Sequence, residues 1–237
     1  MSRDSNETDS RNRGSGWRLG TRIERLRTSQ SYAHVLVLIV VTVVFLFAAP
    51  TESWALSVNV LLGSAMLAVA VRAAGLATIR PALVLFAVGV AVAVAQLALD
   101  RKTVSGVVWV ADVAFIAATI VVIAVGVVDQ REINRKSISG AVCVYLLLGI
   151  LFTFAYGAVA TLGSEEFFAQ GTDGTTADRV YFSYVTLATL GYGDYTAADS
   201  LGRALAISEA LLGQLYLVTV VALLVGRFGQ RKERAEL

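Results

Sequence analysis

The sequence predicts an all-helical (all-α) transmembrane protein with six membrane-spanning helices in each subunit. Hydrophobic residues make up 56% of its 237 positions, and charged residues only 16%. The mean hydropathy of +0.68 is typical of membrane proteins. Two further observations carry the prediction: the spacing of long apolar segments, and the uneven distribution of Lys and Arg between the loops.

Six apolar segments follow one another along the chain, separated by breaks that contain charged residues, Pro or Gly. Each approaches or exceeds the roughly 20 residues that a helix needs to cross a hydrocarbon core. Pro81 opens the third segment, at a helix position that tolerates proline. The segments cover residues 33–49, 54–71, 81–99, 105–128, 138–162 and 200–226.

The basic residues divide unevenly between the two sides that alternating spans define. If both termini are cytoplasmic, sixteen of the 20 Lys and Arg residues lie inside and four lie outside. Basic residues in short loops favour the cytoplasmic side of the membrane. We therefore expect a multi-pass protein of the cell membrane whose N- and C-termini both lie in the cytoplasm.

Residues 1–32 form a polar tail with seven Arg against four acidic residues. The apolar run that follows is too long for the core of a signal peptide, so we expect no cleavable signal. A short basic helix in this tail would suit the anionic inner leaflet of a membrane, which makes anionic lipids expected partners. The alternative is a solvated tail that only sets the topology. The basic residues concerned are Arg18, Arg22, Arg25 and Arg27.

The stretch between the last two apolar segments carries the most informative pattern, Thr186-x-x-Thr189-Leu190-Gly191-Tyr192-Gly193-Asp194. Gly191 and Gly193 enter positive-φ conformations without a steric cost. Consecutive backbone carbonyls can then point to one side, which an ordinary strand with its alternation does not allow. The pattern therefore predicts a loop that departs from strand geometry.

The residues before this loop, from about Ala177 to Leu187, predict a short helix. Thr175, Thr176 or Asp178 is expected to be its N-cap, because these residue types accept hydrogen bonds from the first free N–H groups. The C-terminal end of such a helix carries partial negative charge. Directed inward, that end would favour a cation in a central cavity.

The nine-position pattern resembles the selectivity filter of tetrameric potassium channels. The resemblance covers a pore domain at residues 138–227, with outer helix, pore helix, filter and inner helix. It implies a homotetramer around a central pore, in which rings of backbone carbonyls replace the water shell of K⁺. The implied K⁺ ligands are the carbonyls of Thr189, Leu190, Gly191 and Tyr192, and the filter ends at Gly193 and Asp194, where Asp194 attracts cations at the outer mouth.

The resemblance also implies residues that support the filter. We expect the ring of Tyr192 to pack against aromatic side chains of the pore helix. Glu209 lies inside a spanning segment, where a carboxylate is costly and usually functional. It is expected to hydrogen-bond behind the filter, to Thr186, or to titrate with pH, and a plain structural role is the alternative. The support residues are Thr186, Tyr181, Phe182, Tyr184 and Glu209.

The last apolar segment carries Gly213, which in the family falls where the inner helix bends to open the pore. The alternative for Gly213 is a small residue that allows close helix packing. Four residues follow at helical spacing and are expected to line the cavity and the inner gate, which would close by dewetting. They are Gln214, Leu217, Val221 and Val225.

The first four segments, residues 33–130, resemble the voltage-sensing region of six-helix potassium channels only in topology. Their fourth segment has no basic residue between Gly106 and Val128, whereas a voltage sensor carries repeated Arg in this helix. We therefore predict weak or absent voltage dependence. Its single charge, Asp112, either pairs with Arg101 or Lys102 or, as we prefer, lies near enough to the outer interface to be hydrated.

Only the short tail 228–237 follows the pore domain, so we expect no cytoplasmic ligand-sensing domain. An enzyme is not expected, because the chain has one His (His34), one Cys (Cys143) and no metal-ligand or nucleophile motif. No cofactor is expected beyond K⁺ as the permeant ion. The expected partners are K⁺, membrane lipids and further copies of the chain, and no nucleic acid. A poorly selective monovalent cation channel is the first alternative; a transporter or a non-conducting membrane partner is the second.

Overall fold

The computed structural model describes residues 32–48, 53–74, 101–128 and 135–235, together with residues 84, 87 and 91. The basic tail 1–31 therefore lies outside the described residues, and so does nearly all of the predicted third segment, 81–99. The described residues of that segment, at positions 84, 87 and 91, are helical.

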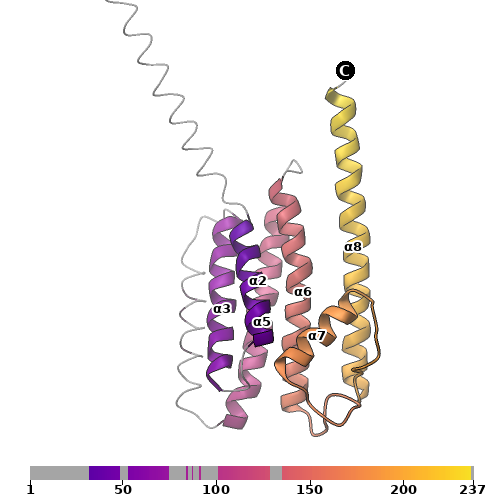
Figure 1. The fold of residues 1–237 in the computed structure, drawn as a ribbon. Helices are drawn as coiled ribbons and strands as arrows, with labels where there is room; N and C mark the ends of the chain where they lie inside the picture. Colours follow the sequence, from indigo (N-terminus) through magenta and orange to yellow (C-terminus); the bar gives the residue numbers. More distant parts are fainter. Residues whose placement is uncertain are drawn as a thin grey trace, which may run out of the picture. The chain divides into compact units, whose positions relative to one another are not determined.

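The described part of the chain is helical, as predicted, and contains no strand, only isolated bridges at Phe168. Each helix begins and ends within a few residues of a predicted segment, except that α8 continues through most of the predicted tail 228–237. Figure 1 shows the helices, which are α2 (Ala33–Ala48), α3 (Ser53–Ala73), α5 (Arg101–Val128), α6 (Arg135–Leu162), α7 (Thr176–Leu187) and α8 (Ser200–Ala235).

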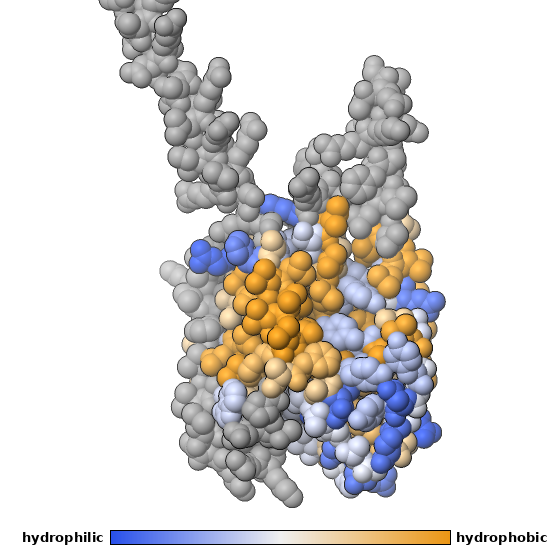
Figure 2. All heavy atoms as spheres, viewed as in Figure 1, coloured by the Kyte–Doolittle hydropathy of each residue, from blue (hydrophilic) through white to orange (hydrophobic). Residues whose placement is uncertain are grey.

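Three described helices are long and apolar enough to cross a membrane. They contain the stretches Val108–Val128, Lys136–Leu162 and Ser200–Val220. The helices α2 and α3 contribute shorter apolar stretches, Ala33–Ala48 and Ser57–Ala73. Hydrophobic side chains gather over a broad area of the face in Figure 2, and hydrophilic ones gather lower down, around the loops that flank α7. This division is typical of a membrane protein.

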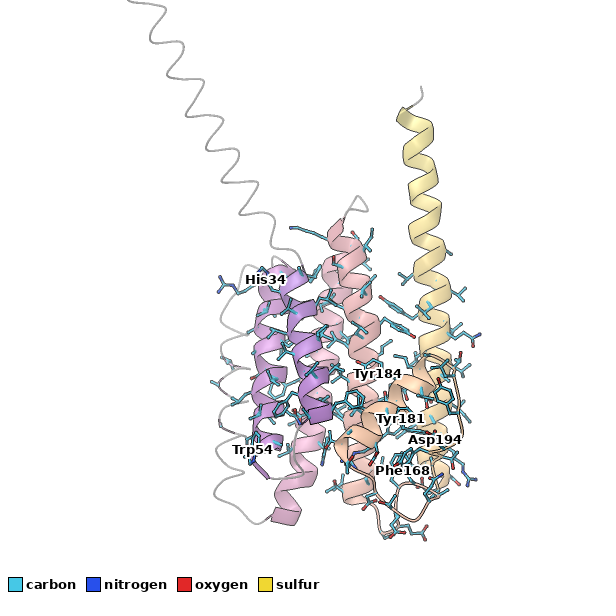
Figure 3. The ribbon with its side chains drawn as sticks, in the orientation of Figure 1. His34, Trp54, Phe168, Tyr181, Tyr184 and Asp194 are labelled. Carbon is cyan, nitrogen blue, oxygen red and sulfur yellow. The ribbon has the colours of Figure 1, made fainter. Side chains whose placement is uncertain are left out.

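The main buried cluster takes its side chains from α2, α3, α5 and α6 and from Val180 of α7, and α5 and α6 share the most extensive contact among the described helices. Small residues allow the close approach: a Cβ atom at Gly157 would lie 2.6 Å from Cε3 of Trp109, so the indole fills the space that the missing side chain leaves. Cys143 is buried in the same core. His34 is exposed in the first turn of α2, at the opposite end of the helices from Trp54 (Figure 3).

Asp112 lies elsewhere than predicted. Its side chain is fully buried, and neither carboxylate oxygen has a hydrogen-bond partner within the described part of the chain. The preferred prediction of a hydrated position near the interface was therefore wrong. The reason is that α5 already begins at Arg101, which places Asp112 about three turns into the helix.

Candidate functional site

The short helix α7 starts with a complete capping box. Thr175 is the N-cap, its hydroxyl accepts from the Asp178 N–H at 3.2 Å, and the Asp178 carboxylate accepts from the Thr175 N–H at 2.7 Å. Burial alone would raise the pKa of Asp178, but the hydrogen bonds from Thr175 and Tyr195 and the charge of Arg179 together lower it. The predicted N-cap is therefore confirmed, and it fixes where α7 enters the structure.

Removing the cap with Thr175→Ala is expected to lower the free energy of unfolding by about 1 kcal/mol, the usual value of an N-cap hydroxyl. The midpoint of thermal unfolding in detergent would measure the loss. Thr172→Ala is the matched control, since it removes a threonine hydroxyl that bonds only the Gly174 N–H in the preceding loop. Equal midpoints for the two variants would contradict the importance of the cap.

Arg179 anchors the first turn of α7 against the loop and against α5. Its guanidinium donates to the backbone oxygens of Asp173 and Gly174 and lies 5.2 Å from the ring centroid of Trp109. This is a cation–π distance. Burial lowers the pKa of Arg179 to about 10, although the nearby Asp173 and Asp178 oppose the shift.

The aromatic residues of α7 have separate partners. Phe182 joins a buried cluster with Tyr156 of α6 and with Phe167 and Phe168 of the loop before α7. The Tyr184 hydroxyl donates to the Leu146 oxygen of α6. These two residues therefore attach α7 to the neighbouring α6 and loop. The expected contact of Phe182 and Tyr184 with the Tyr192 ring is not found in the described structure.

Tyr181 does lie beside Tyr192, with the two rings nearly parallel and their centroids 6.5 Å apart. Its hydroxyl donates to Oδ2 of Asp194 at 2.7 Å, as the labelled side chains in Figure 3 allow the reader to follow. That hydrogen bond raises the pKa of Tyr181 to about 12, so the hydroxyl keeps its proton at neutral pH. Asp194 is thus held in place at the C-terminal end of the loop.

Gln170 completes this outer anchor, and sequence reasoning missed it. Its side-chain amide donates to the backbone oxygen of Asp194 at 2.8 Å and accepts from the Thr196 N–H at 3.4 Å. A backbone hydrogen bond joins the same two segments, since the Ala169 N–H donates to the Thr196 oxygen at 2.8 Å. The loop that precedes α7 therefore fixes the segment that follows the filter pattern.

The filter loop itself has an unusual backbone. The dihedral φ is +56° at Thr189, +56° at Gly191 and +79° at Gly193, while Leu190 and Tyr192 between them are not in this region. Every second residue is therefore left-handed, which breaks the strand geometry in which carbonyls point alternately to opposite sides. A β-branched residue at positive φ is an outlier that marks strain, often at functional sites.

The start of this loop is tied to the end of α7. The Thr189 N–H donates to the Thr186 oxygen, and the Leu190 N–H donates to the Val185 oxygen, both at 2.9 Å. The Leu190 side chain lines an apolar cavity of about 340 Å³ between α2, α6 and α7. The side chain of Leu190 remains 59% exposed in the single chain.

Glu209 of α8 lies behind α7, as predicted, but with other partners than Thr186. Its carboxyl contacts the hydroxyls of Ser183 on α7 and Tyr156 on α6, and its side chain is fully buried. Gly213 follows one helical turn later. A Cβ atom there would lie 2.6 Å from the Leu187 oxygen, so the contact favours the packing alternative for Gly213.

The predicted cavity residues lie beyond this contact on α8. Gln214 and Leu217 are exposed in the single chain. The side chains of Val221 and Val225 lie outside the described residues, so their placement at a gate stays a prediction. The described residues contain no group of His, Cys, Asp or Glu arranged to hold a metal ion.

Residues 140–230 match a family model described as an ion channel. Over 104 residues the chain is also 32% identical to the inward rectifier potassium channel Kirbac3.1 of Paramagnetospirillum magnetotacticum. The matched region is 44% of this chain and 35% of that protein, so the chain spans about a third of its relative. No solved structure matches the chain. The prediction that the chain is not an enzyme is confirmed, because the matched family consists of ion channels.

Proposed function

We propose, from the match of residues 140–230 to a family model described as an ion channel, that the chain forms a homotetrameric, potassium-selective channel in the cell membrane. K⁺ is the permeant ion and the only ligand that the proposal needs. Both termini lie in the cytoplasm, and membrane lipids surround the tetramer, with anionic lipids at the basic tail. Four copies are required because one chain carries one filter loop.

The observation that carries this proposal is the alternation of φ from Thr189 to Gly193. Backbone carbonyls that point toward one axis give a dehydrated K⁺ ion oxygen ligands without a fixed charge. The ties to Thr186, Val185, Tyr181 and Gln170 hold both ends of the loop. These hydrogen bonds within one chain support a preformed loop, and in the proposed tetramer each chain contributes one quarter of every carbonyl ring.

The proposal includes weak or absent voltage dependence. Each charge that crosses a potential of 100 mV contributes about 2.3 kcal/mol, so steep gating needs several charges within the membrane. Between Gly106 and Val128, α5 carries no basic residue, and its one acid, Asp112, is fully buried. This stretch of α5 therefore lacks the repeated basic residues that would couple its movement to voltage.

A planar bilayer with K⁺ on one side and Na⁺ on the other tests the proposal. We expect a reversal potential close to the K⁺ equilibrium potential and an open probability that does not change with voltage. A reversal near zero would favour the poorly selective cation channel, and a steep voltage dependence would contradict the assignment of α5. Lack of any current over a range of pH and lipid compositions would favour the transporter or the non-conducting membrane partner.

A further inference from the structure

Three helices of the pore domain meet at one buried carboxyl group. Ser183 Oγ lies 2.5 Å from Glu209 Oε1 and 2.7 Å from the Gly149 oxygen, and the Tyr156 hydroxyl contacts Glu209 Oε2. Thr153 donates its own hydroxyl hydrogen to the Gly149 oxygen and so supplies none to these contacts. Glu209 comes from α8, Ser183 from α7, and the other residues from α6.

Counting hydrogens shows what this geometry requires. The contacts of Glu209 with Ser183, Glu209 with Tyr156, and Ser183 with the Gly149 oxygen each join two oxygen atoms at hydrogen-bond distance or closer. The two hydroxyl groups supply only one hydrogen each. With an ionised Glu209, one contact would therefore join two oxygens with no hydrogen between them. A proton on Oε1 of Glu209 supplies the missing hydrogen, because Glu209 then donates to Ser183, Ser183 donates to the Gly149 oxygen, and Tyr156 donates to Oε2.

The surroundings of Glu209 also favour its neutral form. Its side chain is fully buried, and an ionised carboxylate in such a position is costly unless a cation pairs with it. The titratable groups that face it from the neighbouring helices are the hydroxyls of Tyr145 and Tyr156 on α6 and of Tyr184 on α7. Among the recorded contacts of Glu209 in the described part of the chain, none is with Lys or Arg.

We propose that Glu209 is a positioning residue that holds a proton at neutral pH and, through Ser183 and Tyr156, clamps α7 between α6 and α8. Ser183 and Leu187 lie one turn apart on α7, and Glu209 and Gly213 lie one turn apart on α8. Glu209 contacts Ser183, and Gly213 contacts Leu187, the last residue before the filter loop. The proton therefore sets the position of the helix end from which the filter starts.

Loss of the proton removes one of the three hydrogen bonds and leaves a charge in the buried site. The clamp then loosens, and the filter loses its support from α8. Because a buried polar group is then left unsatisfied, we expect K⁺ flux to fall about tenfold from neutral to alkaline pH. The expected fall in K⁺ flux rests on the proposed channel function. The presence of a proton on Glu209 does not depend on that function.

Flux of K⁺ from liposomes, measured at neutral and at alkaline pH, tests the consequence. The wild type is expected to show the alkaline fall, and Glu209→Gln is expected to lose it, because an amide bonds both hydroxyls without titrating. Asp112→Asn is the matched control, since it removes a buried carboxyl group outside the pore domain. This variant should still show the fall in K⁺ flux at alkaline pH. A wild-type flux that stays constant or rises at alkaline pH, or an alkaline fall in Glu209→Gln, would overturn the clamp.

Infrared spectra of the same proteins in lipid test the proton without any conduction. A protonated carboxyl group has a carbonyl band separate from that of a carboxylate. Subtracting the Glu209→Gln spectrum from that of the wild type at neutral pH should leave this band, and Ser183→Ala should shift it by removing one hydrogen bond. A carboxylate band in the difference spectrum would refute the proposal. The protonated band in a protein that fails to conduct K⁺ would support the proton and contradict only the channel.

Discussion

Replacing Gly191 with alanine is expected to abolish potassium-selective conduction. Gly191 has a φ of +56°, and no atom lies within 4 Å of the position of an added Cβ, so the effect is one of backbone conformation. A left-handed conformation costs an L-residue about 1–2 kcal/mol, and in the proposed tetramer the cost arises four times at one ring of ligands. We therefore expect the K⁺ flux to fall at least about a hundredfold.

Gly171→Ala is the matched control for this variant. Gly171 has a φ of +74° in the loop before α7, where the added Cβ would meet Glu166 at an ordinary distance of 3.8 Å. The backbone cost is therefore similar, but it falls outside the filter. Reversal potentials of the two variants give the comparison, and only Gly191→Ala should depart from the K⁺ equilibrium potential. Retained selectivity in Gly191→Ala would contradict the assignment of this loop as the filter.

Gly213→Ala is expected to displace the base of the filter. The added Cβ would lie 2.6 Å from the Leu187 oxygen and 2.7 Å from its Cδ1 atom, so α8 must move away from the end of α7. Such overpacking typically costs about 1–3 kcal/mol of stability. We expect a lower midpoint of thermal unfolding and a K⁺ flux reduced about tenfold or more.

Gly63→Ala provides the comparison in a peripheral helix. There the added Cβ would meet Phe115 Cβ at 3.6 Å, an ordinary van der Waals contact. This variant should keep both the unfolding midpoint and the flux close to those of the wild type. If Gly213→Ala behaved in the same way, the contact between α7 and α8 would not be tight, and the bending role predicted for Gly213 would regain support.

The helices were predictable because their apolar segments are bounded by polar or charged residues. The start of α7 is an example, since Thr175 and Asp178 have the spacing of a capping box. The partner of Glu209 was harder to predict. Ser183 and Thr186 are three residues apart and share one face of α7, so the sequence indicates the face that meets α8. Which of the two residues contacts Glu209 depends on the position of α8 along the axis of α7, and the sequence does not specify that position.

Two further features of the site have no signal in the sequence. The glycines at 191 and 193 predict a positive φ. Thr189 does not, because a β-branched residue rarely adopts a positive φ. Gln170 reaches Asp194 from a loop 24 residues earlier, and loop contacts follow no period. Asp112 is a third case: α5 is apolar on all sides around it, so no periodic pattern shows whether that position faces protein or lipid. The number of chains in the assembly and the orientation of the spans stay predictions.

The packing of Trp109 between α6 and Arg179 has a consequence for local unfolding of the protein. The indole fills the space beside Gly157 of α6, and the guanidinium of Arg179 lies over its ring. Separating α5 from α6 would therefore expose an apolar notch and uncover a buried cation at the start of α7 at the same time. We therefore expect α5, α6 and the start of α7 to unfold together as one cooperative unit. Such a unit would cross the boundary between residues 33–130 and 138–227.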